Sequence, residues 1–427
     1  MLDLLVVGAG LSGLMAAYTA AQAGLQVRIV NKGLGSMHWN AGTVDLLGYI
    51  PGAEEKAVQR PLEAIATLLQ KYSDHPYSLL EMKYVPSALH TFVALTEKLD
   101  IPYIGADDNE ENLLLHSPVG VPRPTYLTPK AQLAGNLRRN APILIVGFEG
   151  MLDFYPLLIA ENLTKLGYQA RAETLPMELL TNRRDANTVQ LAHELDDVTR
   201  RTKLGRQLHE LVGANERIGL PAILGMDAHA EVMADIEKLS GAPVFEIPTL
   251  PPSVPGIRLF RALQDGLKSM GVRIETAMEV SGAQKTISQN GTSERLAWLE
   301  SKTTTRPLKH RAANFLLATG GILGGGFNSD ADGRVWEVVL NLPLTMPQDR
   351  SKWFDSSFLS PGGHPVYTGG VRVNRDFQPV ASDGTLLYEN LWVAGNMLSG
   401  ADPILERSLE GIAILTGMAA GQAIATR

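Results

Sequence analysis

Residues 1–13, MLDLLVVGAGLSG, decide the fold of this chain. The apolar run at 4–7 is short enough to be a strand that is buried on both faces. It opens directly into a turn with the spacing Gly-x-Gly-x-x-Gly, and good helix formers follow at 14–21. A strand, a glycine turn and a helix in this order are typical of a nucleotide-binding α/β unit, in which the helix N-terminus faces a phosphate.

Each residue of the glycine turn has an expected role. Gly8 permits the tight turn, Gly10 lets the backbone approach a pyrophosphate, and Gly13 lets the helix pack closely against the strand. The helix N-terminus, where Leu11 and Ser12 lie, presents free N–H groups. We therefore predict that all five residues bind a nucleotide cofactor.

The second strand is predicted at 25–30, and it ends where a dinucleotide site places an acidic residue that binds the adenosine ribose. Here that position is Asn31, followed by Lys32. An asparagine side chain can still donate and accept hydrogen bonds. Both residues are therefore candidates for the cofactor site, although the missing acid weakens the expected contact with adenosine.

The composition is that of a globular protein with room for two domains: 427 residues, 45% of them apolar and 19% charged. A formal net charge of -7 argues against nucleic acid as a partner, because no basic surplus is present to displace counterions. The sequence contains no cysteine, which excludes disulfides and a cysteine-ligated iron–sulfur cluster in this chain. If the protein transfers electrons, a bound organic cofactor carries them and any cluster lies on a partner.

Targeting segments are not expected. The initial apolar run is too short for a signal peptide and has no basic flank, and no window reaches the apolar length of a transmembrane helix. We expect a cytoplasmic protein, and we expect any association with the inner face of the membrane to be peripheral and mediated by a partner.

The chain is expected to divide into two domains. A helix near 257–263 and a strand at 272–275 would rejoin the sheet that begins at residue 4. We predict an α/β protein whose Rossmann-like FAD/NAD(P)-binding domain occupies 1–50 and 251–427. An inserted α+β cap or substrate domain occupies 51–250, and a second excursion of the cap is placed near 325–365.

The predicted cap combines helices, a buried strand and a proline-rich crossing. Amphipathic helices are predicted at 84–99 and 153–166, and a buried strand is predicted at 142–147. Residues 192–239 have a mostly helical pattern, and 245–256 form a rigid crossing rich in proline. We interpret the helical part as a cover over a cleft.

Small residues at the ends of later strands supply the remaining cofactor candidates. The loop at 33–45 would surround a cofactor with backbone N–H groups, and an ordinary surface loop is the alternative. Strands end at glycine in 318–321 and 390–396, and a helix at 410–425 would direct its N-terminus at an anionic group. The predicted cofactor-binding residues from these regions are Ser36, Gly42, Thr43, Thr319, Gly320, Gly321, Gly370, Gly395, Asn396, Gly411 and Ile412.

These segments resemble, in the same order, the flavoprotein superfamily related to the flavoprotein subunits of fumarate reductase and succinate dehydrogenase. The resemblance rests on the glycine turn, on ATGG at 318–321, on LWVAGN at 391–396 with the helix that follows, and on HPVYTGGVRV at 364–373. Within that superfamily, nearly the full length resembles the B-subunit family of anaerobic glycerol-3-phosphate dehydrogenases. The most specific stretches are SMHWNAGTVDLL at 36–47, GFEGMLDFYPLLIAENL at 147–163, FEIPTLPPSVPGIRL at 245–259 and residues 394–407.

The resemblance implies a reaction and partners. It implies oxidation of glycerol 3-phosphate to dihydroxyacetone phosphate, with electrons passing through a membrane-associated iron–sulfur subunit to the quinone pool. It also implies FMN as cofactor, beside a separate catalytic subunit that contains FAD. The glycine spacing itself belongs to dinucleotides and favours FAD, so the identity of the flavin stays open at this point.

Oxidation of a secondary alcohol needs a base near the hydroxyl, a hydride acceptor and cations for the phosphate. We predict His364 as the base, because histidine exchanges protons near neutral pH; a histidine that is only hydrogen-bonded in a turn is the alternative. We predict that Arg407 binds phosphate or stabilises the negative charge of the reduced flavin. Its alternative is an ion pair with Glu406 or Asp402.

Other polar residues receive weaker roles or none. Arg258, at the proline-rich crossing, is a third candidate for an anion ligand. No cluster of His, Asp and Glu has the spacing of metal ligands, and no nucleophile elbow is present, which argues against metal and hydrolase chemistry. The residues left without an assigned role are Arg123, Lys130, His38, Asp45 and Asp402.

Two functions of different classes follow from the sequence. In the first, the chain is a flavoenzyme subunit that oxidises a phosphorylated polyol. In the second, it is an electron-relay or scaffolding subunit, and a sister subunit binds the substrate. A nicotinamide-dependent reductase is a third and weaker alternative, because a second complete glycine fingerprint is absent.

Overall fold

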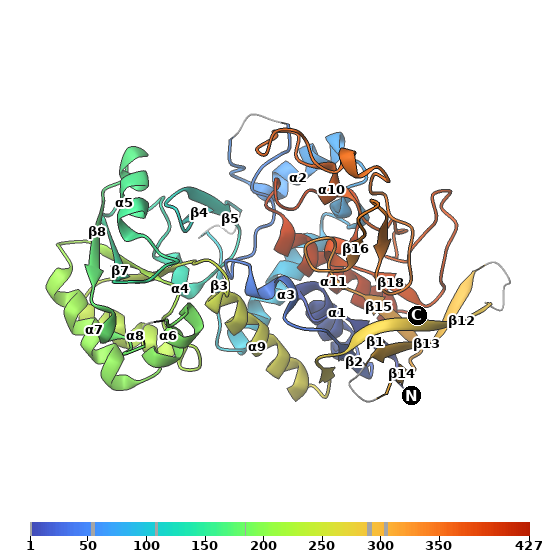
Figure 1. Ribbon diagram of the computed structural model, residues 1–427, viewed down its shortest axis with the longest axis horizontal. Helices are drawn as coiled ribbons and strands as arrows, with labels where there is room; N and C mark the ends of the chain where they lie inside the picture. Colours follow the sequence, from blue (N-terminus) through green and yellow to red (C-terminus); the bar gives the residue numbers. More distant parts are fainter. Residues whose placement is uncertain (1, 53–55, 107–109, 184, 288–292, 303–305) are drawn as a thin grey trace. The chain divides into compact units, whose positions relative to one another are not determined.

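The predicted first strand forms β1 (Leu4–Val7), the middle strand of a five-stranded parallel sheet (Figure 1). All four residues of β1 are buried, as expected for a parallel strand with both faces covered. The prediction that residues 272–275 rejoin this sheet is confirmed. From edge to edge the order is β11 (Arg273–Glu275), β2 (Val27–Val30), β1, β15 (Asn314–Leu317) and β18 (Leu391–Val393), and every neighbouring pair is parallel.

The structure is a computed structural model, and it describes residues 2–52, 56–106, 110–183, 185–287, 293–302 and 306–427. Two compact units are present. The first contains Met1–Ser36, Asp45–Phe92 and Leu263–Arg427, and the second contains Met37–Val44 and Val93–Ala262. The predicted domain boundaries near 50 and 250 stay a prediction. Two of the four divisions between the compact units fall within α3 (Tyr84–Lys98) and α9 (Val254–Ser269), and the other two fall at 36/37 and 44/45.

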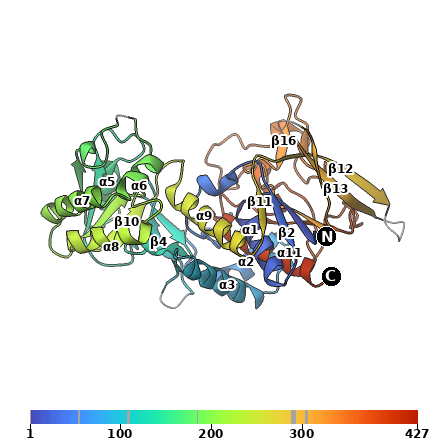
Figure 2. The same ribbon diagram turned by 90° about the horizontal axis from the view of Figure 1, so that it is seen from below.

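Helices α1 (Leu11–Gln22) and α11 (Leu409–Ala425) of the first unit lie side by side (Figure 2). Glycines on α11 allow this close approach. A Cβ added to Gly417 would lie 2.4 Å from the carbonyl oxygen of Ser12, and one added to Gly421 would lie 2.6 Å from that of Ala16. A Cβ does not fit at such distances, so the two helices pack backbone against backbone.

The remaining elements of the first unit surround this sheet and helix pair. An antiparallel three-stranded sheet and a short hairpin follow β11 along the chain. Their bounds, with those of two further helices, are β12 (Glu279–Ile287), β13 (Glu294–Lys302), β14 (Leu308–His310), β16 (Phe327–Ser329), β17 (Val335–Glu337), α2 (Pro61–Lys71) and α10 (Pro365–Thr368).

The second unit has its own four-stranded parallel sheet, in the order β10 (Val244–Ile247), β9 (Arg217–Pro221), β7 (Ile143–Phe148) and β8 (Ala170–Leu175). Alternate residues of β7 serve two separate cores, as the period of a strand requires. Leu144 packs with residues of three helices, α6 (Thr188–Leu195), α7 (Val198–Leu211) and α8 (His229–Ser240). Ile145 packs with residues of α5 (Pro156–Lys165).

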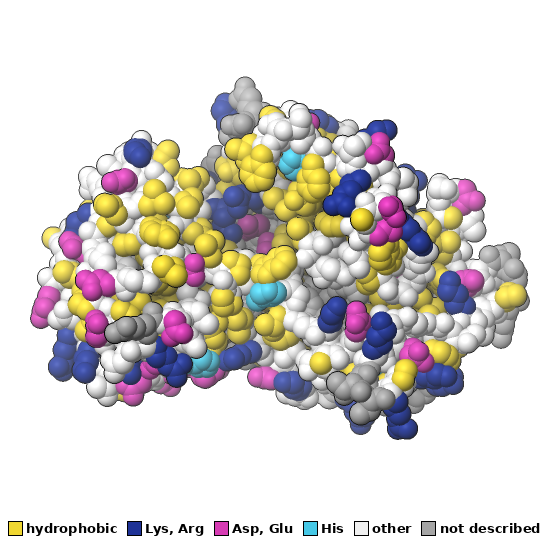
Figure 3. All heavy atoms as spheres, in the orientation of Figure 1, with side chains coloured by type: hydrophobic (Ala, Val, Ile, Leu, Met, Phe, Trp, Pro, Cys, Tyr) yellow, Lys and Arg dark blue, Asp and Glu magenta, His cyan; other side chains and the backbone are white. Residues whose placement is uncertain are grey.

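Short elements complete the second unit. They are β3 (Tyr103–Ile104), β4 (Leu113–His116), β5 (Pro122–Thr125), β6 (Thr128–Pro129) and α4 (Lys130–Leu133). On the face drawn in Figure 3, hydrophobic side chains gather over the region of α5 and the β4–β5 hairpin. Leu152 and Leu157 are 78% and 64% exposed, and Val121 is 50% exposed.

The mostly helical pattern predicted for 192–239 is wrong at one place. Residues 217–221 form the buried strand β9, and the predicted proline-rich crossing begins inside another strand, β10. Gly219 lets β9 pack closely against the Phe245 ring of β10, because a Cβ at this position would lie 2.8 Å from that ring. A strand of five buried residues between amphipathic helices is too short to alter the helical pattern of the window around it.

Candidate functional site

The glycine turn between β1 and α1 excludes side chains on its inner side. Gly8 has φ +109°, and an added Cβ would lie 2.3 Å from the carbonyl oxygen of Ala318. A Cβ on Gly13 would lie 2.0 Å from the carbonyl oxygen of Gly8. The backbone is fixed on both sides, because the N–H of Gly8 donates to Val30 O at 2.9 Å and the N–H of Ala318 donates to Val7 O at 2.8 Å. The turn therefore requires glycine at both positions.

The outer side of the same turn is open. A Cβ added to Gly10 would meet no atom within 4 Å, in contrast to the crowded Gly8 and Gly13. Gly10 is also the N-cap of α1 and supplies no side-chain hydrogen bond to the first turn of the helix. An uncapped helix N-terminus beside open space has N–H groups and a positive dipole end available for an anion.

Three buried polar atoms near this turn or at strand ends lack a hydrogen-bond partner among the described residues: Ser12 Oγ, Asn31 Oδ1 and Asn396 Oδ1. The Asn31 side chain is only 3% exposed, and its Nδ2 donates to Gly33 O at 3.1 Å, which leaves Oδ1 as a free acceptor. An unsatisfied buried polar atom costs about 1–3 kcal/mol. A ligand with hydroxyl or N–H donors would supply the missing bonds, so these atoms fit a dinucleotide.

The ends of β15 and β18 meet at the predicted cofactor residues. The N–H of Gly321 donates to Asn396 O at 3.1 Å, and a Cβ on Gly321 would lie 2.4 Å from that oxygen. The residue after the end of β18 also lies close to α1, because a Cβ on Gly395 would lie 2.8 Å from Ser12 Oγ. The first unit thus brings together three predicted segments, 8–13, 319–321 and 395–396, that are far apart in the sequence.

Other predicted cofactor residues of the first unit lie in different surroundings. Lys32 is exposed and forms an ion pair with Glu279 at 3.2 Å. Gly370 packs against the backbone, where a Cβ would lie 2.6 Å from Ser399 N. The N–H of Gly411 already donates to Asp45 O at 3.1 Å. The remaining two are Ser36, which is half-buried, and Ile412, which is buried.

Gly42 and Thr43 belong to the second unit, whose own residues hold them. Gly42 has φ +77°, and a Cβ there would lie 2.3 Å from Pro255 Cβ. Arg123, which received no predicted role from the sequence, contacts this segment: its Nη2 donates to Thr43 Oγ1 at 2.5 Å. Gln132 Nε2 donates to Ala41 O at 2.8 Å. The assignment of Gly42 and Thr43 to the cofactor site stays a prediction.

His364 has both ring nitrogens engaged with the backbone. Nδ1 accepts a hydrogen bond from the N–H of Asp355 at 3.1 Å, and Nε2 lies 3.1 Å from Phe358 O. The two contacts define a neutral ring with the proton on Nε2. To accept a proton from a substrate, Nδ1 would have to release the Asp355 N–H. His364 as a catalytic base stays a prediction, and this geometry favours the alternative of a histidine hydrogen-bonded in a turn.

Arg407 precedes α11 and is half-buried with φ +50°, a left-handed conformation that costs a non-glycine residue on the order of 1–3 kcal/mol. Within the described ranges, its guanidinium has no ion pair or hydrogen bond with a protein group. The alternative ion pair with Glu406 or Asp402 is therefore not formed. Both carboxylates have other donors: Glu406 Oε2 accepts from Ser408 Oγ at 2.8 Å, and Asp402 Oδ1 accepts from the N–H of Leu405 at 3.0 Å.

Arg258 is not an available anion ligand, and that prediction is corrected. The side chain is 7% exposed, and its two terminal nitrogens donate to the Glu246 carboxylate at 2.7 and 3.0 Å. Its Nε donates to Gly225 O at 2.8 Å. Burial alone raises the pKa of Glu246, but the attraction of Arg258 and the hydrogen bonds outweigh it and hold that pKa below its ordinary value. The arginine joins α9 to β10.

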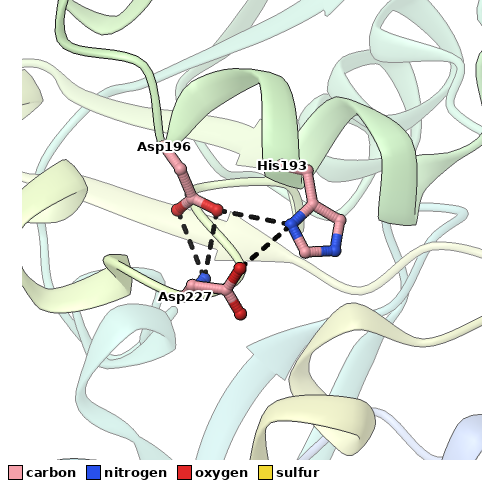
Figure 4. A group of neighbouring side chains, drawn as sticks. All are labelled: His193, Asp196 and Asp227. Atoms are coloured by element: carbon pink, nitrogen blue, oxygen red, sulfur yellow. Dashed lines mark hydrogen bonds and ion pairs between the residues drawn. The ribbon is translucent and has the colours of Figure 1, made fainter.

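One group of metal-ligand type, which the sequence spacing did not reveal, lies in the second unit (Figure 4). His193 Nδ1 is 3.5 Å from Asp196 Oδ2 and 3.2 Å from Asp227 Oδ2. Both carboxylates have other partners. Asp196 Oδ1 accepts the N–H of Met226 at 3.0 Å, and Asp227 Oδ1 accepts from Arg261 at 3.1 Å. These contacts stabilise the loop before α8, and we assign the group a structural role.

Known proteins match nearly the whole chain. A family model described as FAD binding domain matches residues 3–412. The probable B subunit of anaerobic glycerol-3-phosphate dehydrogenase from Halobacterium salinarum is 32% identical, over 99% of this chain and 97% of the relative. The B subunit of anaerobic glycerol-3-phosphate dehydrogenase from Pectobacterium atrosepticum is 30% identical, over 97% of this chain and 96% of that protein.

Among solved structures, the 3-ketosteroid delta1-dehydrogenase of Sterolibacterium denitrificans matches with a TM-score of 0.47 and 12% identity, over 99% of both chains. In the part of the chain that the structure describes, every helix falls short of the length or the apolar character that crossing a membrane requires.

Proposed function

Because the chain belongs to the FAD binding domain family and to the B-subunit family of anaerobic glycerol-3-phosphate dehydrogenases, we propose that it binds FAD and oxidises glycerol 3-phosphate to dihydroxyacetone phosphate. The observation that carries the cofactor site is the open side of the turn at Gly10, near which Ser12 Oγ lacks a partner among the described residues. The residues that would hold the cofactor are those of 8–13, 319–321 and 395–396, together with Asn31.

FAD is proposed over FMN because of Asn31. Its buried Oδ1 lies at the end of β2, where dinucleotide sites accept hydrogen bonds from the adenosine ribose. FMN has no adenosine, so it would leave this acceptor unsatisfied at a cost of about 1–3 kcal/mol. The missing acidic residue therefore does not argue against a dinucleotide, because a neutral amide oxygen accepts the same hydrogen bond without a charge.

The reaction removes a hydride from C2 of the substrate and a proton from the C2 hydroxyl group. When bound, the flavin supplies the two-electron acceptor. We assign the phosphate to Arg407, whose guanidinium is free of protein partners in the described chain and can donate two parallel hydrogen bonds to a phosphate. We assign the proton to His364, which would exchange the Asp355 N–H for the substrate hydroxyl at Nδ1.

The proposal includes partner subunits. Electrons would leave through an iron–sulfur subunit toward the quinone pool, and a separate FAD-containing catalytic subunit would complete the assembly. The absence of cysteine from the sequence supports the first of these partners, because a cysteine-ligated cluster would have to lie on another chain. The membrane association of such a complex would also be the property of a partner.

A second candidate is an electron-relay subunit that binds flavin but no substrate. One observation favours it: both ring nitrogens of His364 contact the backbone, so this histidine is not free to act as the base. In this alternative the sister subunit oxidises glycerol 3-phosphate and this chain only passes the electrons on.

Anaerobic mixing of the purified flavin-loaded chain with glycerol 3-phosphate tests the two candidates. Loss of the flavin absorbance in the isolated chain supports the dehydrogenase, and glycerol, which lacks the phosphate, serves as the control substrate. Loss of absorbance only after addition of the sister subunit supports the relay. A chain that stays oxidised under both conditions contradicts both functions.

A further inference from the structure

A buried pair of ionisable residues lies directly beside Arg407. His75 is 0% exposed and Glu406 is 2% exposed, and His75 Nε2 lies 3.0 Å from Glu406 Oε2. The other ring nitrogen of His75 accepts the N–H of Tyr77 at 3.0 Å, which places the ring proton on Nε2. His75 therefore donates to Glu406. Spacing in the sequence does not reveal this pair, because 331 positions separate the two residues.

Glu406 is the centre of the turn that precedes α11. Its Oε1 accepts the N–H of Asp402 at 3.0 Å, and its Oε2 accepts from Ser408 Oγ at 2.8 Å as well as from His75. Its carbonyl oxygen accepts the N–H groups of Gly48 at 2.8 Å and Tyr49 at 3.0 Å. These bonds fix both ends of the turn and leave little freedom to the residue next to Glu406.

The carboxylates of Glu406 and Asp402 have partners other than Arg407. A guanidinium beside a buried carboxylate ordinarily pairs with it, because an unpaired buried charge is costly. Here Glu406 accepts three hydrogen bonds, from His75, Asp402 and Ser408, and within the described part of the chain the guanidinium of Arg407 has no acid partner. The left-handed backbone at Arg407, φ +50°, is maintained by the bonds on either side of it.

The turn also reaches the other predicted catalytic residue. A Cβ on Gly363, the residue before His364, would lie 2.5 Å from Asp402 Oδ2, and Asp402 donates its own N–H to Glu406. Burial, together with the nearby Glu406, raises the pKa of Asp402 above its ordinary value. The buried network around Glu406 therefore extends from the neighbour of Arg407 to the neighbour of His364 within the first unit.

We propose that His75 and Glu406 are positioning residues, which hold the turn 402–408 so that Arg407 presents a free guanidinium to the phosphate monoester of the substrate. This inference rests on the proposed function, in which Arg407 binds that phosphate. Neither positioning residue contacts the substrate. Their effect passes through the conformation of one backbone position, and a histidine that only stabilised the fold would not act through Arg407.

The test is a double-mutant cycle between His75 and Arg407 in the flavin-loaded full chain, assayed in whichever assembly reduces the flavin. We expect Arg407→Ala to raise KM for glycerol 3-phosphate about 100-fold. We expect His75→Leu to raise it about 10-fold with kcat changed less than about twofold, and to add no further increase in the Arg407→Ala background. His75→Gln, which keeps a donor toward Glu406, should restore most of the affinity.

A second readout is independent of turnover. The thermal shift that inorganic phosphate or glycerol 3-phosphate produces in the flavin-loaded chain should shrink in His75→Leu and in Arg407→Ala alike. The matched control is His310→Leu, because His310 is also buried, at 3% exposed, and lies 2.8 Å from the hydroxyl group of Ser301 in the same unit. That variant should melt at a lower temperature while KM and the phosphate shift stay unchanged.

The outcomes separate the positioning role from the proposed function. If Arg407→Ala raises KM but His75→Leu does not, or if the two effects on KM simply multiply, the positioning role is overturned and the phosphate ligand stands. If Arg407→Ala leaves KM and the phosphate shift unchanged, the assignment of phosphate to Arg407 is overturned first. Should His75→Leu fail to fold, Glu406→Gln takes its place in the cycle with Arg407→Ala, and the same non-additive increase in KM is expected.

Discussion

The turn at 8–13 and the turn at 402–408 each precede a long helix of the first unit, but they are built from different materials. The first consists of small residues except for Leu11, and its constraints are backbone atoms, such as the carbonyl oxygens of Gly8 and Ala318. The second uses side chains, and its central bond joins residues that are 331 positions apart. A turn that depends on backbone contacts can be predicted from a short stretch of sequence. A turn that depends on contacts between distant side chains can be identified only in the folded structure.

The largest expected effect is on the backbone turn. Gly13→Ala would place a Cβ 2.0 Å from Gly8 O, and that oxygen cannot move without displacing β1. We expect loss of the bound flavin and a decrease of about 3 kcal/mol in the free energy of unfolding, measured by flavin absorbance and denaturant titration. Gly10→Ala is the control, because its Cβ meets no atom within 4 Å. It should weaken flavin binding and leave the stability of the flavin-free chain unchanged, and equal stability losses in both variants would contradict the distinction between the two sides of the turn.

The next effect concerns the chemistry attached to the side-chain turn. His364→Ala should lower the rate at which glycerol 3-phosphate reduces the flavin by about 100-fold, the usual size of general-base catalysis, while the flavin content stays the same. Rapid-mixing absorbance measures this rate. An unchanged rate would remove His364 from the mechanism.

A moderate effect is expected for the guanidinium that the side-chain turn presents. Arg407→Lys keeps the positive charge but loses the two parallel hydrogen bonds of the guanidinium to a phosphate. We expect KM for glycerol 3-phosphate to rise about 10-fold, a smaller increase than in Arg407→Ala. Steady-state kinetics on both variants decide this, and equal KM values for the two would show that charge alone is recognised.

The smallest expected effect concerns Asn31, which follows β2. Asn31→Ala removes the unpaired Oδ1, and we expect the dissociation constant of FAD to rise about 10-fold with that of FMN unchanged. Fluorescence titration of the flavin-free protein measures both constants. If the affinities for both flavins fall equally, Asn31 does not contact the adenosine ribose.

Most of the sheet of the first unit could be predicted from the sequence because its strands are continuous apolar runs next to glycines. Residues 4–7 and 391–393 are completely buried in the structure, as their composition indicates. The strand β9 was missed because its five residues contain arginine, glycine and proline, all of which argue against a buried strand when they are read alone. The approach of the Phe245 ring explains Gly219, and hydrogen bonds from Arg217 Nη1 to Ala134 O and Asn136 O explain the buried arginine.

The candidate site divides in the same way. The meeting of 8–13, 319–321 and 395–396 follows from a parallel sheet, whose strand ends gather at one edge. The sequence could not show that Glu406 pairs with His75 and Ser408, or that Arg407 has no acid partner among the residues that the structure describes. Nor could it show that Arg258 pairs with Glu246. Ionisable groups pair according to distance in the fold, and spacing in the sequence carries little of that information.

The binding of a dinucleotide flavin at the turn 8–13 underlies every other assignment, and the identity of the released cofactor tests it. The purified chain is denatured, and the released chromophore is identified by mass spectrometry beside the Gly13→Ala variant. We expect FAD from the unaltered chain and no flavin from the variant. Release of FMN from the unaltered chain, or of FAD from both proteins in equal amounts, would show that the turn does not bind a dinucleotide flavin.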